Sequence, residues 1–213
     1  MKSRHISISL AKALLRFKTP AAIVLAGSAL CGQTRLWRSN PNIVTLQELQ
    51  HSVPGAAQRE MRQAERALAL GREQEAIVHM KSAVRLDPAY VAARNNLAVH
   101  LLPFEPESAI GHLEEAARIN PHHPILFANL AVAYCLVRKF DAAELAARRS
   151  LSLDRGGAWS RFILGMVLVD AGKLTAEALD CLEQTKDLHP AARVLLDRVS
   201  AALGGPAAVQ GSH

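Results

Sequence analysis

The chain has 213 residues, of which half are apolar and 4% are aromatic, and its formal net charge is +6 at pH 7. The positive charge comes from one end of the chain. Residues 1–38 carry seven Lys or Arg and no acidic residue, so the rest of the chain holds 18 basic and 19 acidic residues. A near-neutral body offers no basic face to a phosphate backbone, which argues against nucleic-acid binding.

The N-terminal residues are typical of a secretory signal. Residues 1–20 are basic, and residues 21–31 form an uncharged apolar run that is too short to cross a bilayer as an ordinary helix. Small residues at 26–28 and 27–29 suit a signal peptidase. We therefore expect residues 1–29 to be a signal peptide and the protein to be exported, to the periplasm or out of the cell. The alternative is an uncleaved tail on a protein that is cytoplasmic or lies at the membrane surface.

Residues 30–53 are expected to be a linker that contains a short helix. Cys31 lies at its start, but Leu30 directly before it is too large for the usual lipid-attachment box, which argues against a lipoprotein. The other cysteines, Cys135 and Cys181, are far away in the sequence. An odd number of scattered cysteines defines neither a disulfide framework nor a metal site.

Two kinds of small residue recur together along the rest of the chain, at intervals of 33 to 35 residues. In the first half of each unit they are Ala64, Ala98, Ala131 and Gly165. In the second half they are Ala76, Ala109, Ala143 and Ala178. A closing proline follows at Pro88, Pro121 and Pro190, with Arg155 in its place in the third unit. Small side chains let two helices approach closely, so this spacing predicts four stacked helical hairpins.

The third unit, residues 124–157, shows the pattern most clearly. Ala131 and Tyr134 lie on its first helix, a turn is expected at residues 138–141, and Ala143 lies on its second helix. The second unit carries the same pattern at Leu97, Ala98, Leu101, Ala109, Leu113, Ala116 and Pro121. These residues resemble the tetratricopeptide repeat family, whose unit places a large, a small and an aromatic residue before Ala, a bulky residue and Pro.

The resemblance covers about residues 57–190 and implies an all-α superhelix, or solenoid, of about four helical hairpins with a C-terminal capping helix. We expect the repeat domain at residues 54–203, with units at 57–90, 91–123, 124–157 and 158–190 and the capping helix at 191–203. The cap is expected because a terminal repeat leaves an apolar face that needs cover. Its apolar positions are Val194, Leu195, Val199 and Leu203. Residues 204–213 are expected to be a disordered tail.

In proteins that the chain resembles, the first helices line a concave face. The side of each first helix that lies opposite the packing residues therefore predicts a binding groove. Its central residues are Ala92, Asn95 and Val99, then Ile125, Ala128 and Val132, then Trp159, Phe162 and Met166. One turn further along it continues at Leu102, Cys135 and Val169. We call these twelve residues the groove stripe. The alternative is that the capping helix or the linker covers it.

No motif asks for catalysis, a cofactor or a metal. Residues 172–175 lack the glycine spacing and the Ser or Thr beside the lysine that a phosphate-binding loop needs. His122 and His123 are adjacent in a loop with no second cluster of ligands near them in the sequence. No Ser/His/Asp or Cys/His set shares a known motif. We therefore expect a protein that is not an enzyme and has no cofactor.

The sequence favours an interaction scaffold that binds a partner protein or peptide segment in the groove. A second hypothesis is a self-assembling structural subunit of an envelope-associated complex, which would be a homo-oligomer. A third, an RNA-binding helical repeat, is disfavoured by the near-neutral body and the repeat length. The clamp that some relatives of this kind use for acidic chaperone tails is also disfavoured, because no Lys lies on the first helices of the second and third units.

Overall fold

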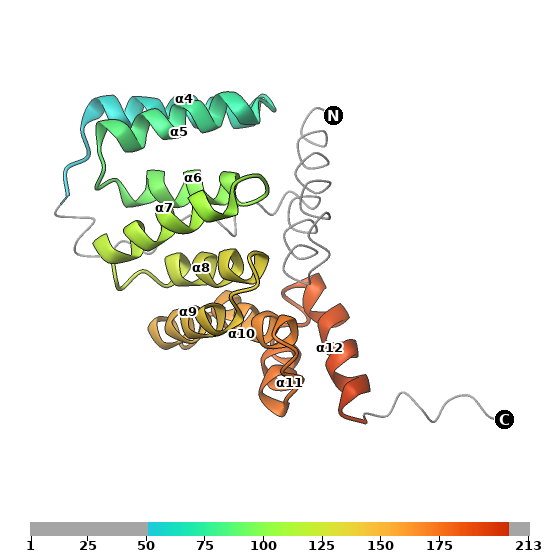
Figure 1. Cartoon of the computed structure of the whole chain (residues 1–213). Coiled ribbons are helices and arrows are strands. Elements are labelled where there is room, and N and C mark those ends of the chain that lie inside the picture. Colours follow the sequence, from blue (N-terminus) through green and yellow to red (C-terminus); the bar gives the residue numbers. More distant parts are fainter. Residues whose placement is uncertain (1–50, 205–213) are drawn as a thin grey trace.

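The computed structural model describes residues 51–204. These residues form nine helices and no strand (Figure 1). The helices are α4 Gly55–Ala69, α5 Glu73–Leu86, α6 Val91–Leu101, α7 Pro106–Ile119, α8 Pro124–Leu136, α9 Phe140–Leu153, α10 Ala158–Asp170, α11 Ala176–Glu183 and α12 Pro190–Ala202. The all-α solenoid that the sequence predicts is therefore confirmed, with a final helix after the fourth hairpin.

Three of the expectations concern parts of the chain outside the described residues. They are the signal peptide at 1–29, most of the linker at 30–53, and the tail at 204–213, of which only Gly204 is described. These stay predictions. No helix in the described part of the chain is both long enough and apolar enough to span a membrane.

The hairpins stack in chain order. The two helices of each hairpin pack side by side, and each second helix also packs against the first helix of the next unit. Figure 1 shows α4–α5, α6–α7 and α8–α9 one below the other, with α12 at the far end of the array. The first helices α8 and α10 touch directly, and α12 packs against both α10 and α11. One continuous core therefore runs through the whole array.

The small residues that define the repeat lie at the closest helix contacts. The three alanines on the first helices are fully buried. At Gly165, an added methyl group would lie 2.9 Å from Cγ of Leu182 and 3.1 Å from Cβ of Cys181. Carbon atoms in good contact lie about 3.5–4.0 Å apart, so α10 and α11 can approach in this way only because position 165 has no side chain.

The turn between α8 and α9 is shorter than the sequence predicts. The second helix already begins at Phe140, so Phe140 and Asp141 belong to α9 and not to the turn. Arg138 has a φ of 59°, and the N–H of Lys139 donates to the carbonyl of Tyr134 over 2.9 Å. A left-handed residue and this bond end α8 as a C-terminal cap does. No glycine marks the position, which is why the sequence does not reveal it.

The fourth hairpin departs from the other three. The sequence predicts that its unit closes at Pro190, but α11 has only eight residues and ends at Glu183. Its start is capped by Thr175, whose side-chain oxygen accepts a hydrogen bond from the N–H of Ala178 over 3.3 Å. The chain then turns through residues 184–189 before α12 begins.

The capping helix buries a different face from the expected one. Leu195 and Val199 are buried as predicted. Val194 and Leu203 are 65% and 48% exposed, and Ala192 is fully buried instead. The expected apolar face is therefore wrong at two of its four positions. Ala192, Leu195 and Val199 recur at spacings of three and four, so one narrow face of α12 meets the array.

Buried polar side chains join neighbouring units. The hydroxyl of Ser150 on α9 donates to the carbonyl of Pro124 over 2.9 Å and lies 2.8 Å from the hydroxyl of Ser160 on α10. The amide of Asn129 on α8 donates to the side-chain oxygen of Asn95 on α6 over 2.7 Å. Each bond is made inside the core, where an unmade bond would cost about 1–3 kcal/mol. These contacts fix the register of one unit on the next.

The contact at Gly165 gives a stability prediction. Gly165→Leu should lower the free energy of unfolding by about 1–3 kcal/mol or more, because the new side chain forces α10 and α11 apart. Gly111→Leu is the matched control, since nothing lies within 4 Å of an added methyl group there. In urea unfolding followed by circular dichroism, the control should be as stable as the parent or more stable. Equal stability of the two variants would contradict this packing.

Candidate binding groove

The groove stripe runs along α6, α8 and α10, but most of it is closed to solvent. Ala92, Val99, Ile125 and Trp159 are partly exposed. The other eight residues have exposed fractions of 1% or less, and they are Asn95, Leu102, Ala128, Val132, Cys135, Phe162, Met166 and Val169. The role of these residues in binding stays a prediction, but the stripe is not the open surface that the sequence alone suggests.

The middle helix, α8, is buried on nearly every side. Leu130 and Ala131 on its packing face are buried, as predicted, and so are Ala128, Val132 and Cys135 on the opposite face. The helices packed against it are chiefly α7, α9 and α10. A helix that is apolar all round belongs to an interior rather than to a surface. The array therefore buries the face that a first helix of a solenoid normally turns towards solvent or a ligand.

An aromatic cluster closes the end of the stripe in the fourth unit. The ring of His189 stacks on Phe162 with centroids 4.8 Å apart and meets Trp159 edge-on at 5.3 Å. The two aromatic rings lie 5.6 Å from each other. His189 comes directly before α12 and is itself buried. The sequence predicts Phe162 as an exposed contact residue, but the start of the capping helix covers it.

Burial lowers the pKa of His189 below its usual value of 6.5, because apolar surroundings disfavour the charged ring. The unfolded chain therefore takes up this proton more readily than the folded chain does. The contribution of His189 to stability is fully present above the pKa of the unfolded state, about 6.5, and is lost as the pH falls below it. Acidification should loosen the start of α12 first.

Sequence reasoning missed one recurring polar position. The residue directly before each closing proline, or before Arg155 in its place, is polar in all four units. These residues are Asp87, Asn120, Asp154 and His189, at spacings of 33, 34 and 35. All except Asp154 are buried, and the carboxylate of Asp87 lies 2.8 Å from the ring of His51. A polar residue that keeps the period of the prolines is the signal that could have found His189.

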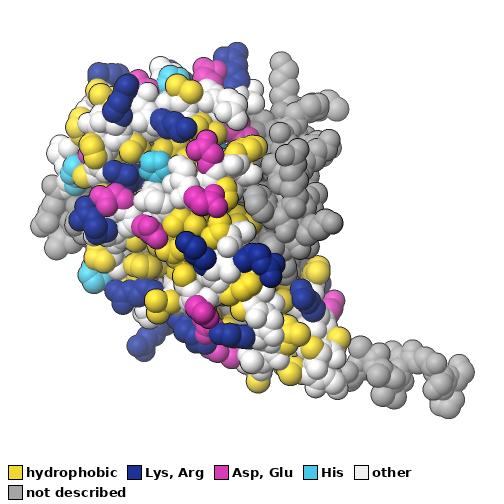
Figure 2. All heavy atoms as spheres, viewed as in Figure 1, with side chains coloured by type: hydrophobic (Ala, Val, Ile, Leu, Met, Phe, Trp, Pro, Cys, Tyr) yellow, Lys and Arg dark blue, Asp and Glu magenta, His cyan; other side chains and the backbone are white. Residues whose placement is uncertain are grey.

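Acidic and basic side chains are interspersed on the face of the array that Figure 2 shows. Arg148 on α9 donates to Glu144 over 2.9 Å and to Glu177 on α11 over 2.6 Å. Lys173 donates to Glu144 over 2.6 Å and, with Arg148, holds the pKa of that carboxyl below its usual value. Exposed pairs of this kind contribute about 0–1 kcal/mol each. This face therefore presents no field of one sign.

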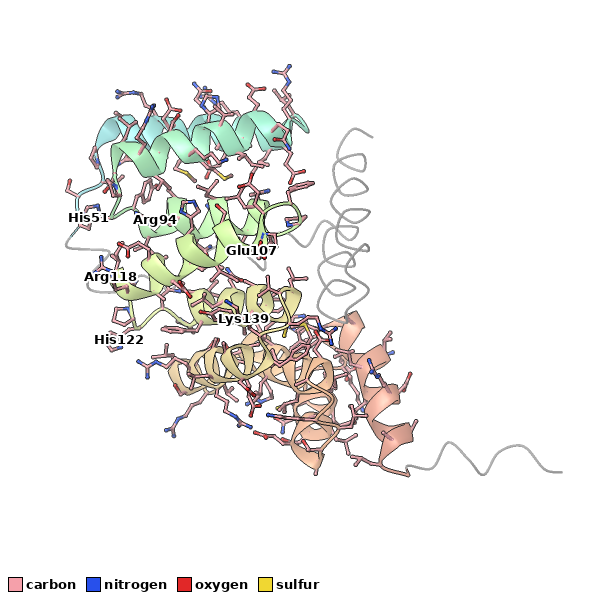
Figure 3. The ribbon with its side chains drawn as sticks, viewed as in Figure 1. His51, Arg94, Glu107, Arg118, His122 and Lys139 are labelled. Carbon is pink, nitrogen blue, oxygen red and sulfur yellow. The ribbon has the colours of Figure 1, made fainter. Side chains whose placement is uncertain are left out.

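Ionisable side chains also mark the two edges of the array. Figure 3 shows His51, Arg118 and His122 along the edge formed by the loops between units. Glu107 and Lys139 lie towards the opposite edge, where the turns within the hairpins are found. All five are exposed. They lie away from the groove stripe, so the candidate site is an apolar one.

The described residues hold no group of three or more His, Cys, Asp or Glu side chains that could bind a metal ion. His122 is exposed while His123 is buried, so the two rings lie in different surroundings. Gly172, with a φ of 73°, lies in the turn between α10 and α11. Burial raises the pKa of both Cys135 and Cys181, that of Cys181 to about 11. Neither thiol has the low pKa of a nucleophile.

Burial of Phe162 changes what its replacement should do. Phe162→Ala should lower the free energy of unfolding by about 3–5 kcal/mol, because it leaves a cavity under His189. Val99→Ala, at a partly exposed stripe position on α6, should cost less than half as much. Urea unfolding of both variants measures the difference. If Phe162→Ala were no less stable than Val99→Ala, the aromatic ring would not belong to the core.

Neither a family model nor a curated protein matches the chain. Solved structures match its fold. TTC0263, a TPR protein from Thermus thermophilus, is 21% identical over 94% of this chain and 97% of that one, with a TM-score of 0.56. MamA from Desulfovibrio magneticus RS-1 is 13% identical over 72% and 88%, with a TM-score of 0.62. A chain of the APC/C hetero-tetramer Cut9–Hcn1 is 20% identical over 84% and 32%, with a TM-score of 0.58. The chain therefore has the tetratricopeptide repeat fold.

Proposed function

We propose that this protein is a non-enzymatic interaction scaffold that holds a helix or an extended segment of a partner protein against its groove stripe. One observation carries the proposal. Ala92, Ile125 and Trp159 occupy corresponding positions on three successive first helices, at spacings of 33 and 34 residues, and all three are partly exposed. They form an apolar row across the units, with the buried part of the stripe next to it.

The binding energy would come from burial of apolar side chains. One large partner side chain buried against the row contributes roughly 1.5–3 kcal/mol, and part of that gain is lost in ordering the partner segment. Trp159 is the strongest candidate anchor, because Trp is enriched among the residues that dominate binding energies at interfaces. A few such contacts are enough for useful affinity, without any charged contact.

The comparisons support association with proteins as the kind of role. The matching chain of Cut9–Hcn1 is part of a hetero-tetramer of two different proteins. Identity at this level supports the comparison of folds, and the nature of the partner comes from the apolar chemistry of the stripe. Self-assembly into an envelope-associated structural complex is the alternative, and the same experiment distinguishes it.

A photo-crosslinking amino acid at position 99, which is partly exposed on α6, tests the proposal in the host cell. The matched control carries the same amino acid at Leu145, which is 74% exposed on α9. We expect one adduct of defined mass from position 99 and none from position 145. With the identified partner purified, Trp159→Ala should weaken binding at least tenfold, and Leu145→Ala should leave it unchanged. Adducts only between copies of this chain would favour self-assembly, and equal adducts from both positions would contradict groove binding.

We also propose that residues 1–29 direct export. The support is the basic start and the apolar run at 21–31. Leu25→Arg should block export, because a charge inside the run opposes insertion. Mass spectrometry of the mature N-terminus checks this, with Val209→Arg in the C-terminal tail as the control. An intact Met1 on parent protein in the soluble cytoplasmic fraction would contradict export.

A further inference from the structure

We propose that residues 30–50 of the chain itself cover the groove stripe until a partner segment displaces them. The proposal rests on the proposed function, since it names what occupies the same groove before the partner arrives. It makes the free protein self-inhibited rather than open. The argument has three steps, which concern the burial of the stripe, the reach of the segment and its chemistry.

The first step is that the stripe needs a cover. Val132 and Cys135 on α8 and Met166 on α10 are fully buried, although they lie opposite the packing faces of their helices. The capping helix packs against α10 and α11, which accounts for Phe162 under His189. It does not account for the stripe on α8, where α7, α9 and α10 take up the other sides. Another part of the chain must therefore lie over α8.

The second step is reach. The described chain begins at His51, whose ring lies 2.8 Å from the carboxylate of Asp87 at the end of α5. This pair fixes the start of the repeat domain at the junction between the first and second units. Neighbouring helices pack about 8–10 Å apart, so α8 lies within a few helix diameters of His51. Residues 30–50 span about 30 Å as a helix and more when extended, which is enough to follow the stripe across the units.

The third step is chemistry. Ile43, Leu46 and Leu49 recur every three residues and share one side of a helix. Thr45 and Gln47 lie on its flanks. An amphipathic segment of this kind is what an apolar groove between helices binds. The stripe matches it, because its buried residues are apolar apart from Asn95. Residues 30–50 also stay on the chain whether or not residues 1–29 are removed.

A cover of this kind has a consequence for binding. The apparent affinity for a partner falls in proportion to the fraction of molecules in which the segment has left the groove. Partner binding would therefore be tightened by any change that weakens the segment, without a new contact to the partner. The partner segment should resemble residues 41–49 in its apolar spacing, because the two occupy one surface.

The accessibility of Cys135 tests the proposal in the full chain. Cys31→Ser provides the background, and N-ethylmaleimide labelling followed by mass spectrometry reports each remaining thiol separately. Leu46→Asp with Leu49→Asp should speed the labelling of Cys135 at least tenfold. Cys181, which packs between α10 and α11, should keep its rate. Thr45→Asp with Gln47→Asp adds the same charge beside the apolar face and should change neither rate.

Three results would overturn the proposal. Unchanged labelling of Cys135 in the Leu46 and Leu49 variant would mean that another segment covers the stripe. Faster labelling of both thiols, with loss of helical circular dichroism, would make residues 30–50 a fixed part of the core. Protection of Cys135 that disappears on dilution of the parent would make the cover a second copy. No partner is used, so failure here leaves the crosslinking result untouched, and failure of crosslinking leaves this one untouched.

Discussion

The close approach of two helices at one small residue is the contact on which the rest of the array depends. It recurs at Ala64, Ala98, Ala131 and Gly165, and all four are buried. At Gly165 even a methyl group would meet Leu182 at 2.9 Å. This contact fixes how each first helix is rotated about its own axis. It therefore also fixes which residues face away from the second helix, and in three units those residues form the groove stripe.

The fold could be predicted from the sequence because its cause is local and periodic. Two small residues per unit keep a spacing of 33 to 35, and chance does not keep both in step through four units. Periodicity also shows which residues share a face of a helix. It does not show what covers that face. Phe162 and His189 are 27 residues apart in the chain, and only the turn after the short α11 brings the histidine onto the ring. The exposure of the site could not be predicted for that reason.

The apolar character of α8 and α10 connects the fold with the proposed function. An array whose first helices are apolar on the groove side would expose a large apolar patch if the groove were empty, and such patches mark interaction sites or cause aggregation. Cover by residues 30–50 in the free chain, and by a partner segment in the complex, meets this constraint in both states. The partly exposed row at Ala92, Ile125 and Trp159 gives the partner a place to begin. The mixed charges on the face shown in Figure 2 add no competing site there.

The most direct measurement of this account is the oxidation of methionine in the intact protein. Met61 and Met80 lie in the packing core, with exposed fractions of 5% and 1%, and Met166 lies on the groove stripe with 0%. Dilute hydrogen peroxide oxidises accessible methionine to the sulfoxide, and peptide mass spectrometry gives a rate for each site. A covered stripe predicts that Met166 is oxidised as slowly as Met80. Oxidation of Met166 many times faster than that of Met61 and Met80, in a chain that keeps its helical signal, would show an open groove and contradict the account.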